Sequence, residues 1–483
     1  MVFNSIEFFI FLGIVYGLYW GVFKNHLKMQ NLLFLIASYV FYGWWDWRFL
    51  SLILLSTTVD YFVGIQIDST EKPLNRKYWL WVSVVFNLGL LGFFKYYNFF
   101  INSWLEMFST LGYDIKSTWT LQILLPVGIS FYTFQTMSYS FDIYYKKLKP
   151  TKNFIYFATF VSFFPQLVAG PIERASNLLS QITNQRNFNL VQTKDGVKLI
   201  LWGLFKKIAI ADSLAPIVDD VFANSSGYPA STLILGVVLF SFQVYGDFSG
   251  YSDIAIGTAK LFGVELKSNF KFPVFSRNVA EYWQRWHVSL STWFRHYVYI
   301  PLGGSRSSKL ISVRNICIVF LISGFWHGAN WTFIFWGAIH ALAFIPVFLM
   351  GRNAIYKNSV VAENTIFPSF IEIGQMAMTF AIVTFSRIFF RADSITDAFN
   401  YIIYIIRDFR YESYVHPLGY RMTDYYVLII VFVIYEYVIR KDERSPLKFK
   451  SQTVRYSVYS VLILTMLLFY DDTINQTFIY FQF

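Results

Sequence analysis

The stretch "SGFWHGANW" (residues 323–331) places one histidine, two tryptophans and two glycines between two long apolar runs, 312–326 and 331–349. Asn330 belongs to the residue types that cap helix N-termini, so we expect a helix to begin at Trp331. Gly324 and Gly328 permit a tight backbone ahead of that helix. His327 then lies just before a helix start, in a region where lipid is expected.

Apolar runs like these two recur along the whole chain of 483 residues, of which 55% are hydrophobic and 14% charged. A soluble domain carries about 25% charged residues. A helix needs about 20 mostly apolar residues to cross the hydrocarbon layer. We therefore predict one membrane domain, 1–483, in an all-α polytopic protein with about 11 to 13 membrane segments, the shorter ones re-entrant. The runs are 6–23, 31–45, 49–65, 79–100, 123–145, 154–168, 233–262, 312–326, 331–349, 367–390, 425–438 and 458–470.

The basic residues lie in short loops between these runs, and the net charge is +11. Cytoplasmic loops of membrane proteins carry an excess of Lys and Arg, so these loops are predicted to be cytoplasmic and the N-terminus to be outside. This distribution argues against nucleic-acid binding. A single cysteine, Cys317, excludes an internal disulfide and a cysteine-based metal cluster. The loops are 24–28, 71–77, 146–152, 277–314 and 440–455.

His327 has two interpretations. The amino end of a helix disfavours an imidazolium, and a neutral imidazole can act as a general base. The alternative is a structural histidine that is hydrogen-bonded between helices. His287, which lies 40 residues upstream, could approach His327 in three dimensions or lie at the membrane interface. His340 is about 20 Å further along a continuous helix, so we expect it to be structural and remote.

No other catalytic motif accompanies the histidines. The chain has no HxxxH or HExxH spacing, so no metal site is predicted, and it has no GxSxG to suggest a serine nucleophile. Asp247 and Asp253 lie in one apolar run and would face about 120° apart on a helix, so they are not expected to form a carboxylate pair. Asp247 either accepts hydrogen bonds from a neighbouring helix or lines a substrate path.

The segment 160–174 contains Pro165, which breaks a helix interior. Irregular backbone at membrane depth is tolerated only where it is buried or lines a cavity. Gln166, Glu173 and Arg174 therefore become candidates for a substrate path, unless the segment is a plain interfacial loop. Beside His327, we also assign Trp326 and Asn330 as substrate-path candidates.

Two further segments are expected at the membrane surface. Residues 283–297 place Trp283, Trp286 and Trp293 on one helical face, which predicts an amphipathic helix anchored at the cytoplasmic interface. Residues 201–214 carry Lys206 and Lys207 within an apolar pattern, which predicts a surface-lying or re-entrant helix.

An ordered set of motifs resembles the membrane-bound O-acyltransferase (MBOAT) family. "YWQRWHVSLSTWFRHYVYIPLGG" (282–304) and "SGFWHGANWTFIFWGAIHAL" (323–342) carry the family likeness. "LPVGISFYTFQTMSYSFDIYY" (125–145), "FFPQLVAGPIER" (163–174), "YGDFSGYSDIAIG" (245–257) and "FSRIFFRADS" (385–394) resemble its bacterial alginate O-acetylation branch. The resemblance implies a ring of tilted helices around a central pore or funnel. It also implies acyl transfer from a thioester to a hydroxyl, with His327 at the family's near-invariant histidine and His287 at its second histidine.

The same resemblance implies the partners. No cofactor is expected to be bound. An acyl thioester, acetyl-CoA or an acyl carrier, would serve as co-substrate on the cytoplasmic side of a bacterial inner membrane. An extracytoplasmic SGNH-type acetyltransferase would receive the acyl group for O-acetylation of an exported polysaccharide such as alginate. The alternatives are a transporter or flippase, and an O-acyltransferase acting on a protein or lipid hydroxyl. In either acyltransferase we expect a water-filled path to His327, open on the side away from the basic loops.

Overall fold

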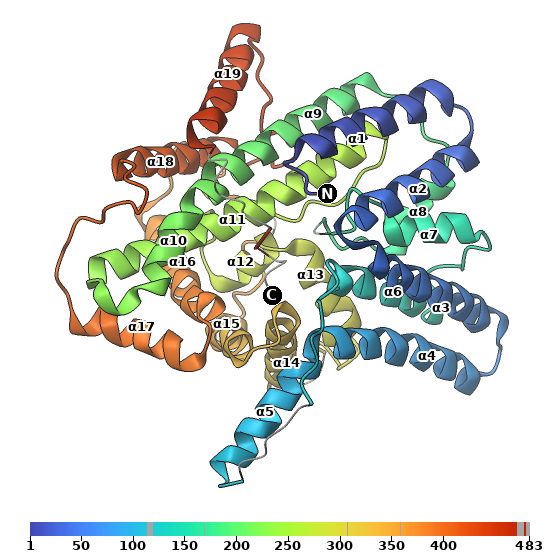
Figure 1. The fold of residues 1–483 in the computed structure, drawn as a ribbon, viewed down its shortest axis with the longest axis horizontal. Helices are drawn as coiled ribbons and strands as arrows, with labels where there is room; N and C mark the ends of the chain where they lie inside the picture. The colour runs from blue at the N-terminus through green and yellow to red at the C-terminus, as the bar shows by residue number, and fades with distance from the viewer. Residues whose placement is uncertain (114–118, 169, 307, 358, 471–477, 480–483) are drawn as a thin grey trace. The chain divides into compact units, whose positions relative to one another are not determined.

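The computed structural model describes residues 1–113, 119–168, 170–306, 308–357, 359–470 and 478–479. Within those residues every regular element is helical and no strand occurs, which confirms the all-α prediction (Figure 1). The α-helices are α1 (Ile6–Gly17), α2 (Leu27–Asp46), α3 (Leu50–Ser69), α4 (Pro73–Leu91), α5 (Tyr97–Thr110), α6 (Ile129–Tyr144), α7 (Phe154–Ser162), α8 (Ala175–Thr183), α9 (Leu190–Phe205), α10 (Ser213–Ala223), α11 (Ala230–Leu261), α12 (Val279–Arg285), α13 (Val288–Phe294), α14 (Lys309–His327), α15 (Trp331–Leu349), α16 (Phe370–Arg391), α17 (Ile395–Arg407), α18 (Met422–Ile439) and α19 (Gln452–Phe469).

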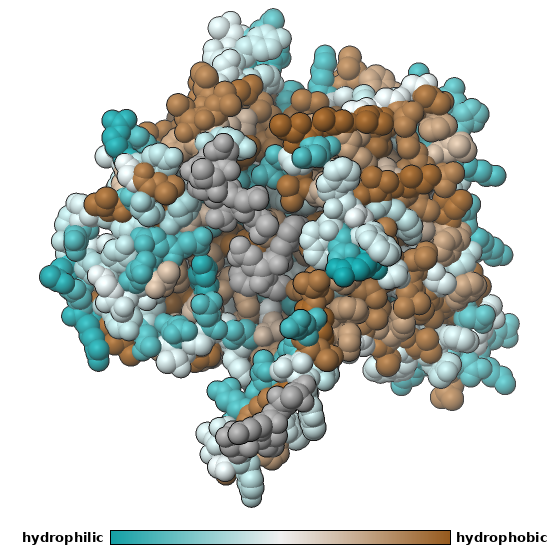
Figure 2. All heavy atoms as spheres, in the orientation of Figure 1, coloured by the Kyte–Doolittle hydropathy of each residue, from teal (hydrophilic) through white to brown (hydrophobic). Residues whose placement is uncertain are grey.

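Eight helical stretches among the described residues are long and apolar enough to cross a membrane. They are Leu27–Ser69, Pro73–Thr110, Ala230–Leu261, Lys309–His327, Trp331–Leu349, Phe370–Arg391, Met422–Ile439 and Gln452–Phe469. Large apolar side chains on them face outward, such as Phe370 at 93% and Leu468 at 81% exposure, and Figure 2 shows broad apolar areas in brown. Water would disfavour so much exposed apolar surface, whereas lipid accommodates it. The chain is a multi-pass membrane protein.

The chain divides into two compact units that interleave in sequence. The first comprises Met1–Gly196 and Thr258–Lys267, and the second comprises Val197–Gly257 and Ser268–Phe483. That 1–483 forms a single domain stays a prediction.

In the first unit, helices α3, α4 and α6 pack together around a buried carboxylate, Asp60. Asp60 accepts hydrogen bonds from Ser140 Oγ at 2.7 Å, from Asn87 Nδ2 at 2.6 Å, and from Ser83 Oγ. These neutral donors satisfy the carboxylate at a depth where an unpaired charge is costly.

The predicted break within 160–174 is also in the first unit, and the structure confirms it. Helix α7 ends at Ser162 and α8 begins at Ala175, and the described residues between them, 163–168 and 170–174, are not helical. Most of them are buried, including Phe164 and Gln166. Burial within protein is the condition under which such backbone is tolerated in a membrane.

The second unit contains a tight hairpin of α14 and α15, which lie side by side in Figure 1. A Cβ atom at Gly324 would lie 2.2 Å from the Phe333 carbonyl oxygen, and one at Gly337 would lie 2.4 Å from the Phe320 carbonyl oxygen. Two glycines therefore let the two backbones touch, as in close membrane helix pairs. Asn330 caps α15 by accepting the Thr332 N–H at 3.0 Å, as predicted.

Both segments expected at the membrane surface are instead internal to the second unit. Residues 283–297 do not form one helix, because α12 ends at Arg285 and His287 adopts a left-handed conformation with φ 44°. Trp283, Trp286 and Trp293 are buried, at 8%, 4% and 6% exposure. Aromatic side chains pack well both in a protein interior and at a membrane interface. The amphipathic pattern therefore could not distinguish an internal segment from an interfacial helix.

For the segment of Lys206 and Lys207, the surface-lying alternative was wrong for a similar reason, and the re-entrant alternative stays a prediction. They begin a π-helical turn, η4 (Lys206–Asp212), between α9 and α10, and both are buried. Lys206 Nζ lies 2.6 Å from Asp253 Oδ2, and Lys207 Nζ lies 2.7 Å from Asp247 Oδ1. Asp247 and Asp253 are thus separate, as expected, and each is paired with a lysine.

Candidate functional site

His327 is the last residue of α14 and is 2% exposed. Four aromatic rings surround its imidazole, with centroids 5.0 Å (Trp326), 5.1 Å (Trp336), 5.6 Å (Phe390) and 6.4 Å (His287) away. They come from α14, α15, α16 and the break between α12 and α13. His327 thus lies at a helix carboxyl end as well as ahead of an amino end. The sequence argument considered only the amino end, so it overstated the preference for a neutral ring.

His287 lies beside His327, as the sequence suggested it could. It is fully buried, and its Nδ1 lies 3.2 Å from Asn269 Oδ1. Because that oxygen also accepts the Ser289 backbone N–H at 3.3 Å, it is an acceptor, and His287 Nδ1 carries the proton. The lone pair of the neutral ring is then on Nε2, which is the nitrogen that can act as a base. Burial lowers the pKa of His287 to about 3, which keeps the ring neutral.

The structure shows that His340 is not remote, because α15 turns back along α14. The Trp336 ring contacts both histidines, lying 5.1 Å from His327 and 4.8 Å from His340. The His340 ring is fully paired: Nδ1 accepts the Trp283 indole N–H at 3.3 Å, and Nε2 lies 3.0 Å from Ser386 Oγ, which can donate to Val383 O. This pairing supports the expected structural role, at a position the linear estimate placed too far away.

A small cavity of about 10 Å³ lies between these groups. Arg387 also lines it, and its guanidinium donates to Ser241 O at 2.6 Å and to Tyr282 OH at 3.3 Å. Sequence reasoning missed Arg387, since nothing local distinguishes it from Arg391 one turn later. The cavity is lined by Val244, Tyr282, Trp286, His327, Trp336, His340, Val383, Arg387 and Phe390.

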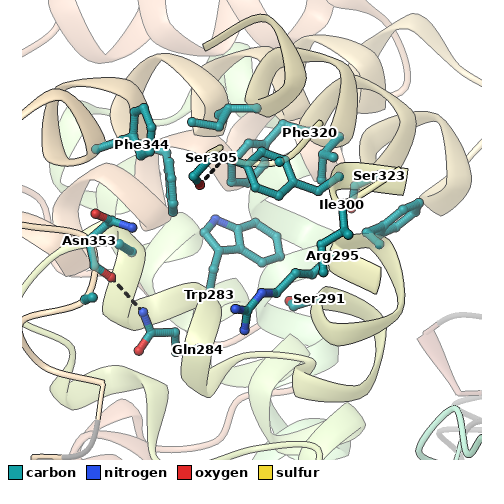
Figure 3. A pocket seen from close by; sticks show the side chains of 18 of the residues that line it. Trp283, Gln284, Ser291, Arg295, Ile300, Ser305, Phe320, Ser323, Phe344 and Asn353 are labelled. Carbon is teal, nitrogen blue, oxygen red and sulfur yellow. Dashed lines mark hydrogen bonds between the residues drawn. The ribbon is translucent and has the colours of Figure 1, made fainter. Parts of the chain in front are cut away.

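A much larger pocket, of about 740 Å³, has Trp283 in its wall. Figure 3 shows the Trp283 indole among the lining side chains, with Phe320 and Ser323 nearby and Gln284 bonded to Asn353. Its walls are mainly apolar, and it is within the usual size range of small-molecule sites. The basic side chains Arg295, Arg306 and Lys357 also line it, and no Asp or Glu is among its described lining residues.

Much of the wall of this pocket comes from the basic stretch 277–314, whereas the sequence predicted a path open on the side away from the basic loops. The expected direction came from the run of α14, which leads away from the basic stretch. The sequence could not show that α12 and α13 would form a pocket wall within that basic stretch. A path from the opposite side stays a prediction.

Of the other predicted site residues, Trp326 packs on the His327 ring, while Asn330 caps α15 and donates to Asp393 O at 2.8 Å. Asp247 is one residue from a ring that packs on His287. That ring is Phe248, 4.7 Å from His287. Asp247 itself accepts the Ile479 backbone N–H at 2.6 Å, and Phe478 packs on Phe248 at 5.8 Å. The C-terminal pair 478–479 is therefore part of this region, which no local sequence signal indicated.

Gln166, Glu173 and Arg174 belong to the first unit. Gln166 donates to Gln135 Oε1, and Glu173 accepts the Lys267 N–H at 2.5 Å and the Asn177 side chain at 2.6 Å. These contacts fix the irregular segment within the first unit, so for Gln166 and Glu173 they support a structural role. Whether these residues line a substrate path stays a prediction.

The fold and site define a multi-helix membrane protein with two buried histidines beside a large amphipathic pocket. The sequence profile of the membrane-bound O-acyltransferase family (MBOAT) matches residues 148–390. The chain belongs to this family, and it is an O-acyltransferase.

Curated relatives cover most of the chain. "Probable alginate O-acetylase AlgI" of Azotobacter vinelandii is 43% identical over 70% of this chain and 67% of its own length. The protein of the same name from Pseudomonas aeruginosa is 39% identical over 83% of this chain and 74% of its own. "Peptidoglycan O-acetyltransferase" of Helicobacter pylori is 34% identical over 82% of this chain and 78% of its own.

Proposed function

We propose that this protein transfers an acetyl group from a cytoplasmic thioester donor for the O-acetylation of an exported polysaccharide. The names of the relatives support both parts, because they describe O-acetylation of alginate and of peptidoglycan. The observation that carries the chemistry is the buried pair of imidazoles, His327 and His287, with ring centroids 6.4 Å apart.

The reaction is an acyl exchange between sulfur and oxygen. His327 accepts the proton of the acceptor hydroxyl, whose oxygen forms an ester bond with the acyl carbon. The carbon–sulfur bond breaks, and the proton passes to the leaving thiolate, which departs as a thiol. His287 assists through its Nε2 lone pair, since its Nδ1–H is held by Asn269.

The large pocket is the proposed donor site. Coenzyme A and carrier proteins both present a thioester on a phosphorylated pantetheine arm, and guanidinium and ammonium groups are the usual protein ligands of phosphate. Arg295, Arg306 and Lys357 supply such groups, and the apolar walls suit the arm itself. No bound cofactor is part of this proposal.

We place the protein in the inner membrane of a bacterium, with the donor on the cytoplasmic side. The basic stretch beside the large pocket supports this orientation. An extracytoplasmic SGNH-type acetyltransferase would take the acyl group to the polysaccharide, since the donor and the exported polymer lie on opposite sides of the membrane.

The test uses membranes that contain the full-length protein and a thioester labelled in its acetyl group. We expect wild-type membranes to move the label from sulfur to an oxygen ester, and His327→Ala membranes with equal protein content to lose this activity. If the wild-type protein leaves the thioester intact while a substrate crosses the membrane without receiving the label, the result would instead support a transporter.

A further inference from the structure

Trp283 stands between two spaces of very different size. Its indole lines the pocket of about 740 Å³. It also contacts Trp336 and His340, with ring centroids 5.8 Å and 5.0 Å away. Those two residues line the cavity of about 10 Å³ that also contains His327. The indole is thus part of the partition between the proposed donor pocket and the histidine.

Several contacts hold the indole in this position. Its N–H donates to His340 Nδ1 at 3.3 Å, and its ring packs against Phe320 at 5.4 Å. The helix that carries it, α12, is fixed by Glu281, which binds Arg277 at 3.0 Å and Arg285 at 2.8 Å. Because the indole is held at its N–H and through its helix, it keeps a fixed position in the partition.

We propose that Trp283 determines which acyl groups reach His327, admitting acetyl and rejecting longer chains. This inference rests on the proposed function. The cavity beyond the indole has about the volume that one water molecule requires. Of the acyl chains that a thioester presents from the large pocket, the two-carbon acetyl group demands the least additional room here. Each further methylene needs space that the indole and the rings of Trp336 and His340 already occupy.

The test compares acetyl-, butyryl- and octanoyl-CoA, each labelled in the acyl group, as donors to the full-length protein in membranes. The readout is the ratio of kcat/KM for octanoyl to kcat/KM for acetyl. We expect Trp283→Ala to raise this ratio at least about tenfold, the scale on which pocket size discriminates between substrates. Trp283→Phe should lie between wild type and Trp283→Ala. A substitution that only loosens the fold would lower transfer from all three donors alike.

Trp293 provides the matched control. It is a similarly buried tryptophan on α13, at 6% exposure, and it packs on Tyr297 and on Phe294, which lines the large pocket. Trp293 itself is not among the described residues that line either space. Trp293→Ala should leave the octanoyl-to-acetyl ratio unchanged.

The outcomes separate the two claims. An unchanged ratio in active Trp283→Ala and Trp283→Phe proteins would overturn the role of Trp283 while leaving acyl transfer intact. If Trp283→Ala fails to accumulate, Trp283→Phe alone decides the question. Failure of the wild-type protein to use any of the three thioesters would contradict the proposed function itself.

Discussion

At the residue scale, the hydrogen bond from His287 Nδ1 to Asn269 determines which ring nitrogen can act as a base. Asn269 Oδ1 accepts from three groups: the His287 ring, the Ser289 N–H and the Ser289 hydroxyl at 2.9 Å. An imidazole held in this way presents a single tautomer and a fixed orientation, and both are required for proton transfer.

Replacing Asn269 by Ala should therefore lower the turnover of acyl transfer. Loss of the partner that orients a functional imidazole typically costs about 10- to 100-fold. Asn269→Asp, which keeps an acceptor oxygen, should retain more activity than Asn269→Ala. Rates of label transfer at equal protein content would measure both variants. Wild-type turnover in Asn269→Ala would show that the orientation of His287 is irrelevant.

The sequence supplied the two histidines but not the groups around them. His327 and His287 stood out because their motifs and an apolar setting mark them locally. The positions of three other residues near the site depend on how distant segments pack: Asn269, Arg387 and His340, which returns toward His327. Spacing along one helix cannot report such contacts, and the linear estimate for His340 failed because the chain turns back.

At the scale of elements, the α14–α15 hairpin positions His327, and glycine makes the hairpin possible. The two backbones approach so closely at Gly324 and Gly337 that a methyl group at either would overlap a carbonyl oxygen of the opposite helix. Separation of the helices would move His327 relative to Trp336 and the partition.

Gly324→Ala should destabilise the protein by about 1–3 kcal/mol, the usual cost of overpacking a well-packed contact. Gly374 in α16 is the control, because nothing lies within 4 Å of a Cβ atom built there. Gly374→Ala should be neutral or stabilising by up to about 1 kcal/mol. Thermal unfolding in detergent measures both, and equal behaviour of the two variants would contradict the close contact.

Element boundaries were predictable where a side chain acts on its own backbone. The Asn330 cap and the break after Ser162 depend on local chemistry and were found. The break at His287 was missed because the aromatic periodicity continues through it. The turn η4 was missed because its lysines are satisfied by aspartates on α11, which the local pattern does not contain.

At the scale of the whole molecule, composition predicted a multi-pass helical protein but not which charges would be internal. Long apolar runs in the sequence directly indicate segments that cross the membrane. Buried ion pairs do not appear in such a pattern. One example lies in the second unit, where Lys207 Nζ is 2.8 Å from Asp212 and 2.7 Å from Asp247. The backbone N–H of Ile479, near the end of the chain, donates to the same Asp247.

Lys207→Met should destabilise the protein strongly, because it leaves the buried Asp247 carboxylate and the partly buried Asp212 carboxylate without their cation. Breaking a buried pair by removing one partner typically costs about 3–5 kcal/mol. The exposed pair of Arg410 and Asp408 serves as a control, and Arg410→Ala should cause no measurable change. Thermal unfolding of both variants tests this, and an unaltered Lys207→Met protein would refute the role of the buried pair.

The central claim is that His327 and His287 act together on one acyl-transfer step, and a double-mutant cycle tests it most directly. Transfer from a labelled acetyl thioester would be measured for wild type, His327→Ala, His287→Ala and the double variant, at matched protein content in membranes. We predict that each single variant loses about 100-fold or more and that the double variant is no slower than the slower single one, as for residues that act as a unit. Wild-type transfer in either single variant, or losses that multiply in the double variant, would contradict the account.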